Sequence, residues 1–339
     1  MKNKKMNQVP KYNPYIHLHS TILQKKFNKV SIFPNYEVSH PFENQVENGY
    51  TSQLAFSEPF QVLSQEGNNV LNRIINLYKN DVVTFGVGNR VPMSLRSLGY
   101  KCKWISDFNE CKILTNYLSI LAGKELVAHT FKSSYSHVNI GAINDDKPVD
   151  QWHCDSVPFV LVILMSDMTG ATGGELQVLK KERDLGFKVL LENKSEIIVN
   201  DLLTVQYPAI GSAIFMQGSK MLHHVTPVKH AKEPRITVVN SYMPVDPSVP
   251  DETRLAIFKN EPEVCYYEYA KHKANIAIAK FKQIIETEPQ NNGEYYANEF
   301  SKIINDLREN TGVLDGSIDD GHIAGLFVKE VSEKFVSKM

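Results

Sequence analysis

The sequence predicts a mainly β fold with helical additions, and three observations support this. Between about residues 125 and 245, short apolar runs alternate with turns that contain glycine, proline or asparagine, which is typical of a β sandwich or barrel. On either side of that region, apolar residues recur at helical spacing, first over residues 66–79 and later over residues 266–286. The longest apolar run, residues 157–165, has the length of a strand and is too short to cross a membrane.

The pattern divides the chain into three parts. An N-terminal arm, residues 1–50, shows little periodicity beyond one short strand near residues 30–33. A central domain covers residues 51–250, and a C-terminal helical region covers residues 251–339.

Within these parts, each element is expected from its own periodicity. Helices are expected over residues 66–79, 108–121, 266–286 and 299–309. Strands are expected over residues 126–131, 136–140, 158–165, 174–179, 203–207, 212–216, 223–226 and 236–242. The glycine-rich run over residues 170–174 is interpreted as a tight hairpin between two of these strands.

The composition excludes several classes of protein. The chain has 339 residues, 42% hydrophobic and 22% charged, which is ordinary for a globular protein with a full core. The formal net charge of −1 gives no basis for binding nucleic acid or an anionic membrane, so neither is expected as a partner. The 4 cysteines show no metal-type spacing, and so few in a chain of this length predict reduced thiols and a cytoplasmic location.

Three residues of the core region have the chemistry and spacing of a metal site. His153 and Asp155 lie two positions apart, and on a β-strand such residues point to the same face. A second histidine, His223, follows His153 by 70 positions. Two histidines and one carboxylate on one side of an ion form the facial triad of non-haem Fe(II) oxygenases, which leaves the other side open. The sequence therefore predicts that His153, Asp155 and His223 bind Fe(II) and form the catalytic centre.

Each ligand has a plainer structural alternative when it is taken alone. A His-x-Asp pair is common on exposed strand faces, and His223 is equally compatible with a hydrogen-bonded core residue. The order of the residues along the chain favours the metal site over these alternatives. Of the two adjacent histidines, His224 would point to the opposite face of the strand, and we assign it a structural role.

Arg235 lies 12 positions after His223, at the start of an apolar strand. A half-buried guanidinium needs an anionic partner, and arginine holds a carboxylate through two parallel hydrogen bonds. We therefore expect Arg235 to bind the far carboxylate of 2-oxoglutarate, with the hydroxyl of Thr237 beside it. His137 and Asn139 share one face of an earlier strand, where they hold the other end of 2-oxoglutarate, orient the substrate, or form a satisfied pair inside the barrel.

These residues resemble the Fe(II)/2-oxoglutarate-dependent oxygenase superfamily over about residues 125–245. The run His223-x-Val225-Thr226-Pro227-Val228 and the run Gly173-Gly174-Glu175-Leu176 are most similar to the prolyl-hydroxylase-like branch. The residues around Trp152-His153 are more weakly similar to the branch of free amino-acid hydroxylases and halogenases. The resemblance implies a double-stranded β-helix, or jelly roll, as the core, flanked by N-terminal and C-terminal α-helices.

The resemblance also implies a reaction. Fe(II), 2-oxoglutarate and O2 would serve as cofactor and co-substrates, and oxidative decarboxylation to succinate and CO2 would accompany attack on an unactivated C–H bond. Halogenases of this family have a small residue where Asp155 stands, so the resemblance implies hydroxylation rather than chlorination. Desaturation, epimerisation and cyclisation use the same ligands and stay open. A protein side-chain hydroxylase and a metal-binding jelly-roll sensor without catalysis are further alternatives.

The sequence says less about partners. We expect a small-molecule substrate, with amino-acid-like compounds as first candidates, and Arg90 or Arg96 either binds its carboxylate or is an ordinary surface residue. Glu175 either meets a substrate amine or is a surface carboxylate of a hairpin. The C-terminal helices are either a buttress on the β core, a homodimer contact or a docking site for a protein substrate.

Overall fold

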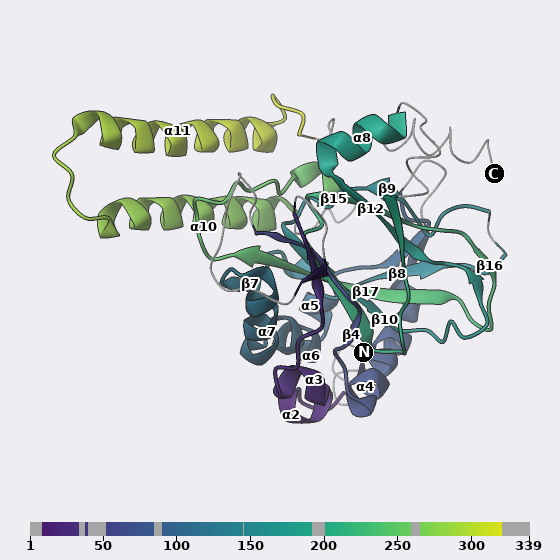
Figure 1. Ribbon diagram of the computed structural model, residues 1–339. Coiled ribbons are helices and arrows are strands. Elements are labelled where there is room, and N and C mark those ends of the chain that lie inside the picture. Colours follow the sequence, from purple (N-terminus) through teal and green to yellow (C-terminus); the bar gives the residue numbers. More distant parts are fainter. Residues whose placement is uncertain are drawn as a thin grey trace.

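The structure is a computed structural model, and it describes residues 9–33, 38–39, 52–84, 90–144, 146–191, 201–258 and 265–320. Its centre is mainly β, with one large and one small antiparallel sheet and a two-stranded ribbon (Figure 1). The helices pack around these sheets, and a long helical hairpin extends away from them. No helix among the described residues is long and apolar enough to cross a membrane.

The large sheet has the strand order β2-β1-β3-β14-β10-β17-β8-β6-β5, and β4 and β7 pair with β14 and β17. Its strands are β1 (Val30–Ile32), β2 (Val38–Ser39), β3 (Leu54–Ser57), β4 (Phe60–Gln61), β5 (Val83–Thr84), β6 (Met93–Leu95), β7 (Leu126–Ala128), β8 (His137–Gly141), β10 (Phe159–Leu164), β14 (Ser212–Met216) and β17 (Arg235–Pro244). The sequence predicted most of the later strands to within a few residues, whereas the short strands before residue 100 were not expected, apart from the one near residues 30–33.

The small sheet has the order β13-β12-β15-β9. Its strands are β9 (Asp150–His153), β12 (Leu176–Glu182), β13 (Leu202–Val205) and β15 (Met221–Val225), and the ribbon pairs β11 (Thr172–Gly173) with β16 (Val228–His230). The run over residues 170–174 was predicted to be a tight hairpin, and this is wrong. β10 pairs with β14 and β17 in the large sheet, while β12 pairs with β13 and β15 in the small one. The glycine-rich run therefore carries the chain from one sheet to the other.

Alternation along the central strands separates two apolar layers. On β10, Phe159, Leu161 and Ile163 pack into the cluster shared with the helices. Val160 and Val162 belong to a second cluster, together with Leu176 and other residues of the small sheet. Because successive strand residues point to opposite faces, the second cluster is the interior between the two sheets.

Helices cover the outer face of the large sheet (Figure 1). They are α2 (Pro14–His17), α3 (Ser20–Leu23), α4 (Gln65–Leu77), α5 (Leu98–Lys101), α6 (Lys103–Asn109) and α7 (Lys112–Ala122), with 3-10 turns η1 (Lys79–Asp81) and η2 (Lys132–Ser134). The Ser64 side chain caps α4 by accepting from the Gly67 backbone N–H at 3.0 Å. The single helix predicted over residues 108–121 is instead two helices, because the backbone at Cys111 is extended.

One helix that the sequence did not predict covers the outer face of the small sheet. This helix, α8 (Arg183–Leu191), packs Val189 and Leu190 against Trp152, Leu179 and Leu222. Its weak apolar periodicity explains why the pattern was missed.

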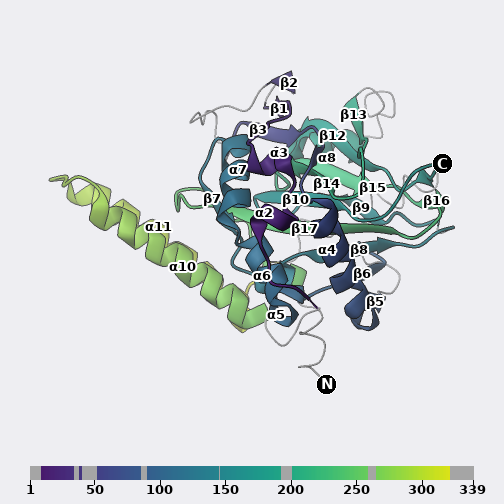
Figure 2. The ribbon, with the colours of Figure 1, turned by 90° about the horizontal axis from the view of Figure 1, so that it is seen from below.

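The C-terminal region forms a hairpin of two long helices that projects from the body (Figures 1 and 2). After the 3-10 turn η3 (Leu255–Phe258), α10 (Cys265–Glu286) runs outward and α11 (Gly293–Asp315) returns. α11 is longer than the predicted helix over residues 299–309. Asn292 caps its start with a side chain that accepts from two backbone N–H groups, and Gly316 ends it with a left-handed φ of 83°.

Candidate metal centre

His153, Asp155 and His223 come together between the two sheets, with one ligand atom of each within 4.8 Å of the others. β15 pairs with β9 so that His223 and His153 are direct partners, and their ring centroids lie 4.1 Å apart. This register explains how residues 70 positions apart in the sequence become neighbours. Asp155 lies two residues beyond the end of β9 rather than on the strand, as the sequence analysis had assumed.

Backbone hydrogen bonds set the orientation of both imidazole rings. The Nδ1 of His153 lies 2.6 Å from the Gln151 carbonyl oxygen, and the Nδ1 of His223 lies 2.9 Å from the Met221 carbonyl oxygen. A carbonyl can only accept, so in each ring Nδ1 carries the proton and donates. Each Nε2 is then an unprotonated lone pair, which is the form that binds a metal.

The two Nε2 atoms face the carboxylate of Asp155. Nε2 of His153 is 3.5 Å from Oδ1, and Nε2 of His223 is 3.5 Å from Oδ2. Burial, followed by the electrostatic influence of the adjacent His153 ring, lowers the pKa of His223 to about 4, so its ring is neutral at pH 7. Asp155 Oδ2 is buried and has no hydrogen-bond partner among the described residues. Three acceptors thus converge with no proton between them, which suits a cation with two nitrogen ligands and one oxygen ligand.

The carboxylate of Asp155 is held in place and kept ionised. Its backbone N–H donates to the Gly218 carbonyl oxygen at 2.9 Å. A methyl group at Gly218 would lie 2.2 Å from Asp155 Oδ2, so only glycine leaves room for the carboxylate. Burial alone would raise the pKa of Asp155, but His223, His153 and Arg90 together hold it below its ordinary value.

Arg90 and Asp150 lie beside the candidate ligands. Arg90 Nε lies 3.3 Å from Asp150 Oδ1, and Arg90 Nη1 lies 3.9 Å from Asp155 Oδ1. Asp150 is buried, with its Oδ1 also 3.5 Å from His153 Nδ1. Sequence analysis did not single out Asp150, although its position three residues before His153 could have suggested that it supports the ring.

Arg235 and Thr237 face the same interior from β17. The alternation that turns Val238 outward to the helices turns Arg235, Thr237 and Val239 inward. Arg235 is 1% exposed, and its Nη1 donates to Thr237 Oγ1 at 3.3 Å. Its Nε has no hydrogen-bond partner, and no carboxylate in the described part of the chain forms an ion pair with it. Burial lowers the pKa of Arg235, and the nearby Tyr207, Asp150 and Glu175 offset this only in part.

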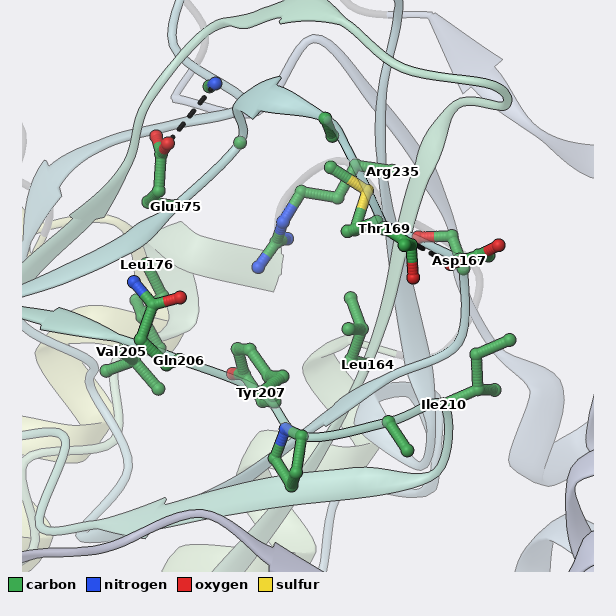
Figure 3. A pocket seen from close by; sticks show the side chains of 17 residues that line it. Leu164, Asp167, Thr169, Glu175, Leu176, Val205, Gln206, Tyr207, Ile210 and Arg235 are labelled. Atoms are coloured by element: carbon green, nitrogen blue, oxygen red, sulfur yellow. Dashed lines mark hydrogen bonds between the residues drawn. The ribbon is translucent and has the colours of Figure 1, made fainter.

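The Arg235 side chain reaches into a cavity of about 230 Å³ between the ends of the two sheets. Figure 3 shows the guanidinium pointing into this space between Glu175 and Tyr207. Glu175, which the sequence left open, accepts hydrogen bonds from Thr226 Oγ1 and from the Gly173 backbone N–H. The Glu175 carboxylate therefore has hydrogen-bond partners within the protein. Tyr207, which the sequence analysis missed, is adjacent to Arg235 and had no motif to mark it.

His137 and Asn139 also face the interior, from β8. Asn139 is the register partner of Thr237, and His137 is the partner of Val239. Asn139 Nδ2 donates to Asp150 Oδ2 at 3.4 Å, but its Oδ1 has no partner among the described residues. Both ring nitrogens of the buried His137 also lack one. No hydrogen bond joins these two residues to each other in the described structure.

His224 lies on the outer face of the small sheet, as the strand alternation predicted. Its ring stacks on Trp152 with centroids 3.9 Å apart, and its Nε2 lies 2.7 Å from Gln177 Oε1. It is turned away from the three ligands and packs beneath α8.

Comparison with known proteins gives structural neighbours only. No family model and no curated protein matches the sequence. Among solved structures, the chain is similar to EctD from S. alaskensis with bound Fe, with a TM-score of 0.43 and 13% identity, covering 66% of this chain and 86% of that one. It is also similar to the non-haem α-ketoglutarate-dependent epimerase SnoN from nogalamycin biosynthesis, with a TM-score of 0.42 and 14% identity, covering 57% and 78%.

A third neighbour is HygX from Streptomyces hygroscopicus with nickel and 2-oxoglutarate bound, with a TM-score of 0.40 and 11% identity, covering 56% of this chain and 83% of that one. Similarity at this level does not transfer an activity.

Proposed function

We propose that this protein is an Fe(II)- and 2-oxoglutarate-dependent dioxygenase that hydroxylates an unactivated C–H bond of a small molecule. The observation that carries the proposal is the convergence of His153, Asp155 and His223 as three acceptors without a proton, in an interior that also contains an unpaired arginine. We interpret the two facing sheets as the double-stranded β-helix of this superfamily.

The donor set favours iron over a structural metal. Two imidazole nitrogens and one carboxylate oxygen on one side of an ion leave positions open for other ligands, as in non-haem Fe(II) oxygenases. A structural zinc site would normally have four protein ligands. Within the described residues, the group has three members.

The unpaired Arg235 favours an anionic co-substrate over a metal-binding sensor. A guanidinium that is buried without an anion is costly, and a ligand carboxylate would complete its hydrogen bonding. We infer that Arg235 and Thr237 hold the far carboxylate of 2-oxoglutarate. When bound, the iron and 2-oxoglutarate supply the oxidising chemistry with O2, and the chain positions the groups and excludes water.

The residues on β8 support a small substrate that carries a carboxylate, such as an amino acid. Burial, followed by the positive charges of Arg96 and Arg90, holds the pKa of His137 well below its ordinary value. His137 is therefore a neutral hydrogen-bonding group in a positive environment, and its two nitrogens have no partner among the described residues. Such a group suits an anionic substrate, and Asp155 occupies the position that a halogenase would leave to chloride.

The test is a succinate-release screen. The protein is loaded with Fe(II) without oxygen, given 2-oxoglutarate and a panel of amino acids and small carboxylic acids, and then exposed to air. We expect at least one compound to raise succinate release above the uncoupled rate and to gain one oxygen atom by mass spectrometry. A chain that binds Fe(II) but neither 2-oxoglutarate nor any compound of the panel would contradict the proposal.

A further inference from the structure

The helical hairpin of α10 and α11 presents an apolar face that nothing in the described structure covers. Along α10, Ile278, Phe281 and Ile285 are exposed, and Ile285 is exposed at 81%. Their spacing of three and four residues places them on one side of the helix. The contacts that anchor α10 to the body, through residues such as Glu268 and His272, lie at its other end.

A second apolar stripe follows α11 with the same spacing. Its exposed members are Phe300, Ile304, Leu307 and Leu314. The rings of Phe281 and Phe300 lie 6.5 Å apart, so the two stripes meet on the same side of the hairpin. The two helices also contact each other through residues outside these stripes, among them the ion pair of Lys280 and Asp306 at 2.5 Å. The apolar face is therefore additional to the surface that the helices bury against each other.

We propose that this face binds the same face of a second copy of this chain, so that two hairpins form a four-helix bundle in a homodimer. A hairpin of two helices cannot bury more than one side of each helix, whereas four helices around a common core can. A two-fold axis lets one self-complementary surface serve both copies.

The charges of the two helices favour this partner. α10 contains four lysines and two glutamates, and α11 contains five acidic and two basic residues. Lys280 and Asp306 already pair within one copy, but the remaining residues still leave α10 net positive and α11 net negative. Placing α10 of one copy against α11 of the other therefore brings opposite net charges together. Pairing of α10 with its own copy would bring lysines together instead.

The size of the face also agrees with a dimer. The helices have 22 and 23 residues, and at about 1.5 Å per residue each is about 33 Å long. Two helices about 9 Å apart present a strip about 20 Å wide, or roughly 600 Å² per copy. Two such faces together bury roughly 1,200 Å², the lower end of the range for specific protein interfaces.

The test is the mass of the full-length protein in solution, measured by sedimentation equilibrium over a range of concentrations. We expect a dimer at micromolar concentration. The double variant Ile285→Glu/Ile304→Glu should weaken the dimer at least about 100-fold, because two apolar contacts per copy are replaced by buried charges. The matched control Gln283→Glu/Asn305→Glu adds the same two charges to the same helices outside the apolar stripes, and should leave the dimer intact.

Far-UV circular dichroism of both double variants should match the wild type, since all four positions are exposed. A wild type that is monomeric at all concentrations would overturn the proposal, and so would a dimer that both double variants preserve. A third variant, Leu326→Glu/Phe327→Glu, lies outside the described residues and should not affect the dimer. If it dissociates the dimer while Ile285→Glu/Ile304→Glu does not, the contact belongs to the C-terminal segment and the proposal is wrong.

Discussion

Two buried clusters in this molecule have the same composition, two histidines and one aspartate, and their chemistry differs. The first is the candidate metal centre of His153, His223 and Asp155. The second lies under the start of α10 and consists of His129, His272 and Asp251, with His129 and His272 fully buried. The ring centroids are 4.1 Å apart in the first cluster and 4.6 Å apart in the second.

The two clusters differ in whether hydrogen-bond donors point toward the aspartate. In the second cluster, His272 Nε2 lies 3.0 Å from Asp251 Oδ2 and Lys273 Nζ lies 2.7 Å from the same oxygen. The other nitrogen of His272 meets Thr130 Oγ1 at 2.7 Å, and His129 Nε2 meets Thr253 Oγ1 at 3.1 Å. A lysine thus already supplies the positive charge.

In the metal centre, both ring protons are directed away from the aspartate, toward backbone carbonyls. Three lone pairs then face one another, and a metal cation bound between them would offset their mutual repulsion. The tautomers set by backbone contacts, rather than the residue types, therefore distinguish the candidate metal site from the hydrogen-bonded cluster.

The largest expected effect comes from removing the aspartate of each cluster in turn. Asp155→Ala should reduce Fe(II) affinity and 2-oxoglutarate turnover more than about 100-fold, since loss of a ligand exceeds the effect of a residue that only supports one. Asp251→Asn should leave one iron per chain and destabilise the fold by about 3–5 kcal/mol, as for a broken buried ion pair. Metal titration and urea unfolding of both variants check this. If Asp155→Ala binds iron as tightly as the wild type, the claim that the cluster of His153, His223 and Asp155 binds the metal is wrong.

Arg235→Met gives the next largest effect. It should weaken 2-oxoglutarate binding about 100-fold, which corresponds to roughly 3 kcal/mol for a charge-assisted contact, without changing the iron content. Without 2-oxoglutarate, the variant should be as stable as the wild type or more so, because the buried charge of Arg235 is unpaired. Calorimetric titration and thermal unfolding with and without 2-oxoglutarate provide the measurement. A large loss of stability without the co-substrate would show that the guanidinium has a structural partner instead.

A smaller effect is expected at Gly218. The added methyl group of Gly218→Ala would lie 2.2 Å from Asp155 Oδ2 and force the carboxylate to move. We expect Fe(II) affinity to fall about 10-fold, in the range for residues that orient a ligand. Gly293→Ala is the control, since a methyl group there meets no atom within 4 Å. Metal titration that finds the two variants equal would mean that the carboxylate tolerates displacement.

The smallest effect is expected on the pH dependence of the free energy of unfolding, through His129 of the second cluster. Burial, followed by the charge of His272, lowers the pKa of His129 to about 3, against about 6.5 in an unfolded chain. Between these values the unfolded chain binds a proton that the native state does not, so stability is complete above pH 6.5 and falls as the pH is lowered. His129→Gln should reduce this slope by up to about 1.4 kcal/mol per pH unit between pH 6 and pH 4. Urea unfolding at several pH values measures it, with His230→Gln as the matched substitution of an exposed histidine.

Much of the core could be predicted from the sequence because its signals are local. The apolar run before Met165 predicted β10, and the short runs around residues 212–216 and 236–242 predicted β14 and β17 to within a few residues. The candidate ligands could be chosen because His-x-Asp, a later histidine and a following arginine keep their order in the chain. The structure brings these residues into one interior.

What the sequence could not predict depends on contacts between distant segments. The crossing from β10 to β12 looks like a hairpin in the sequence, since a glycine-rich turn does not reveal which strands pair. Asp150 and Tyr207 join the site only through the way the sheets face each other. The difference between His129 and His153 is equally invisible, because it lies in which backbone carbonyl or side chain each ring nitrogen meets.

The most direct test is crystallography of the protein grown with Fe(II) under anaerobic conditions, with anomalous diffraction recorded at the iron edge. We predict one strong peak between Nε2 of His153, Nε2 of His223 and the carboxylate of Asp155, about 2.0–2.2 Å from each. A peak beside Asp251 and His272, or no peak near any of the three ligands in iron-loaded crystals, would contradict the account.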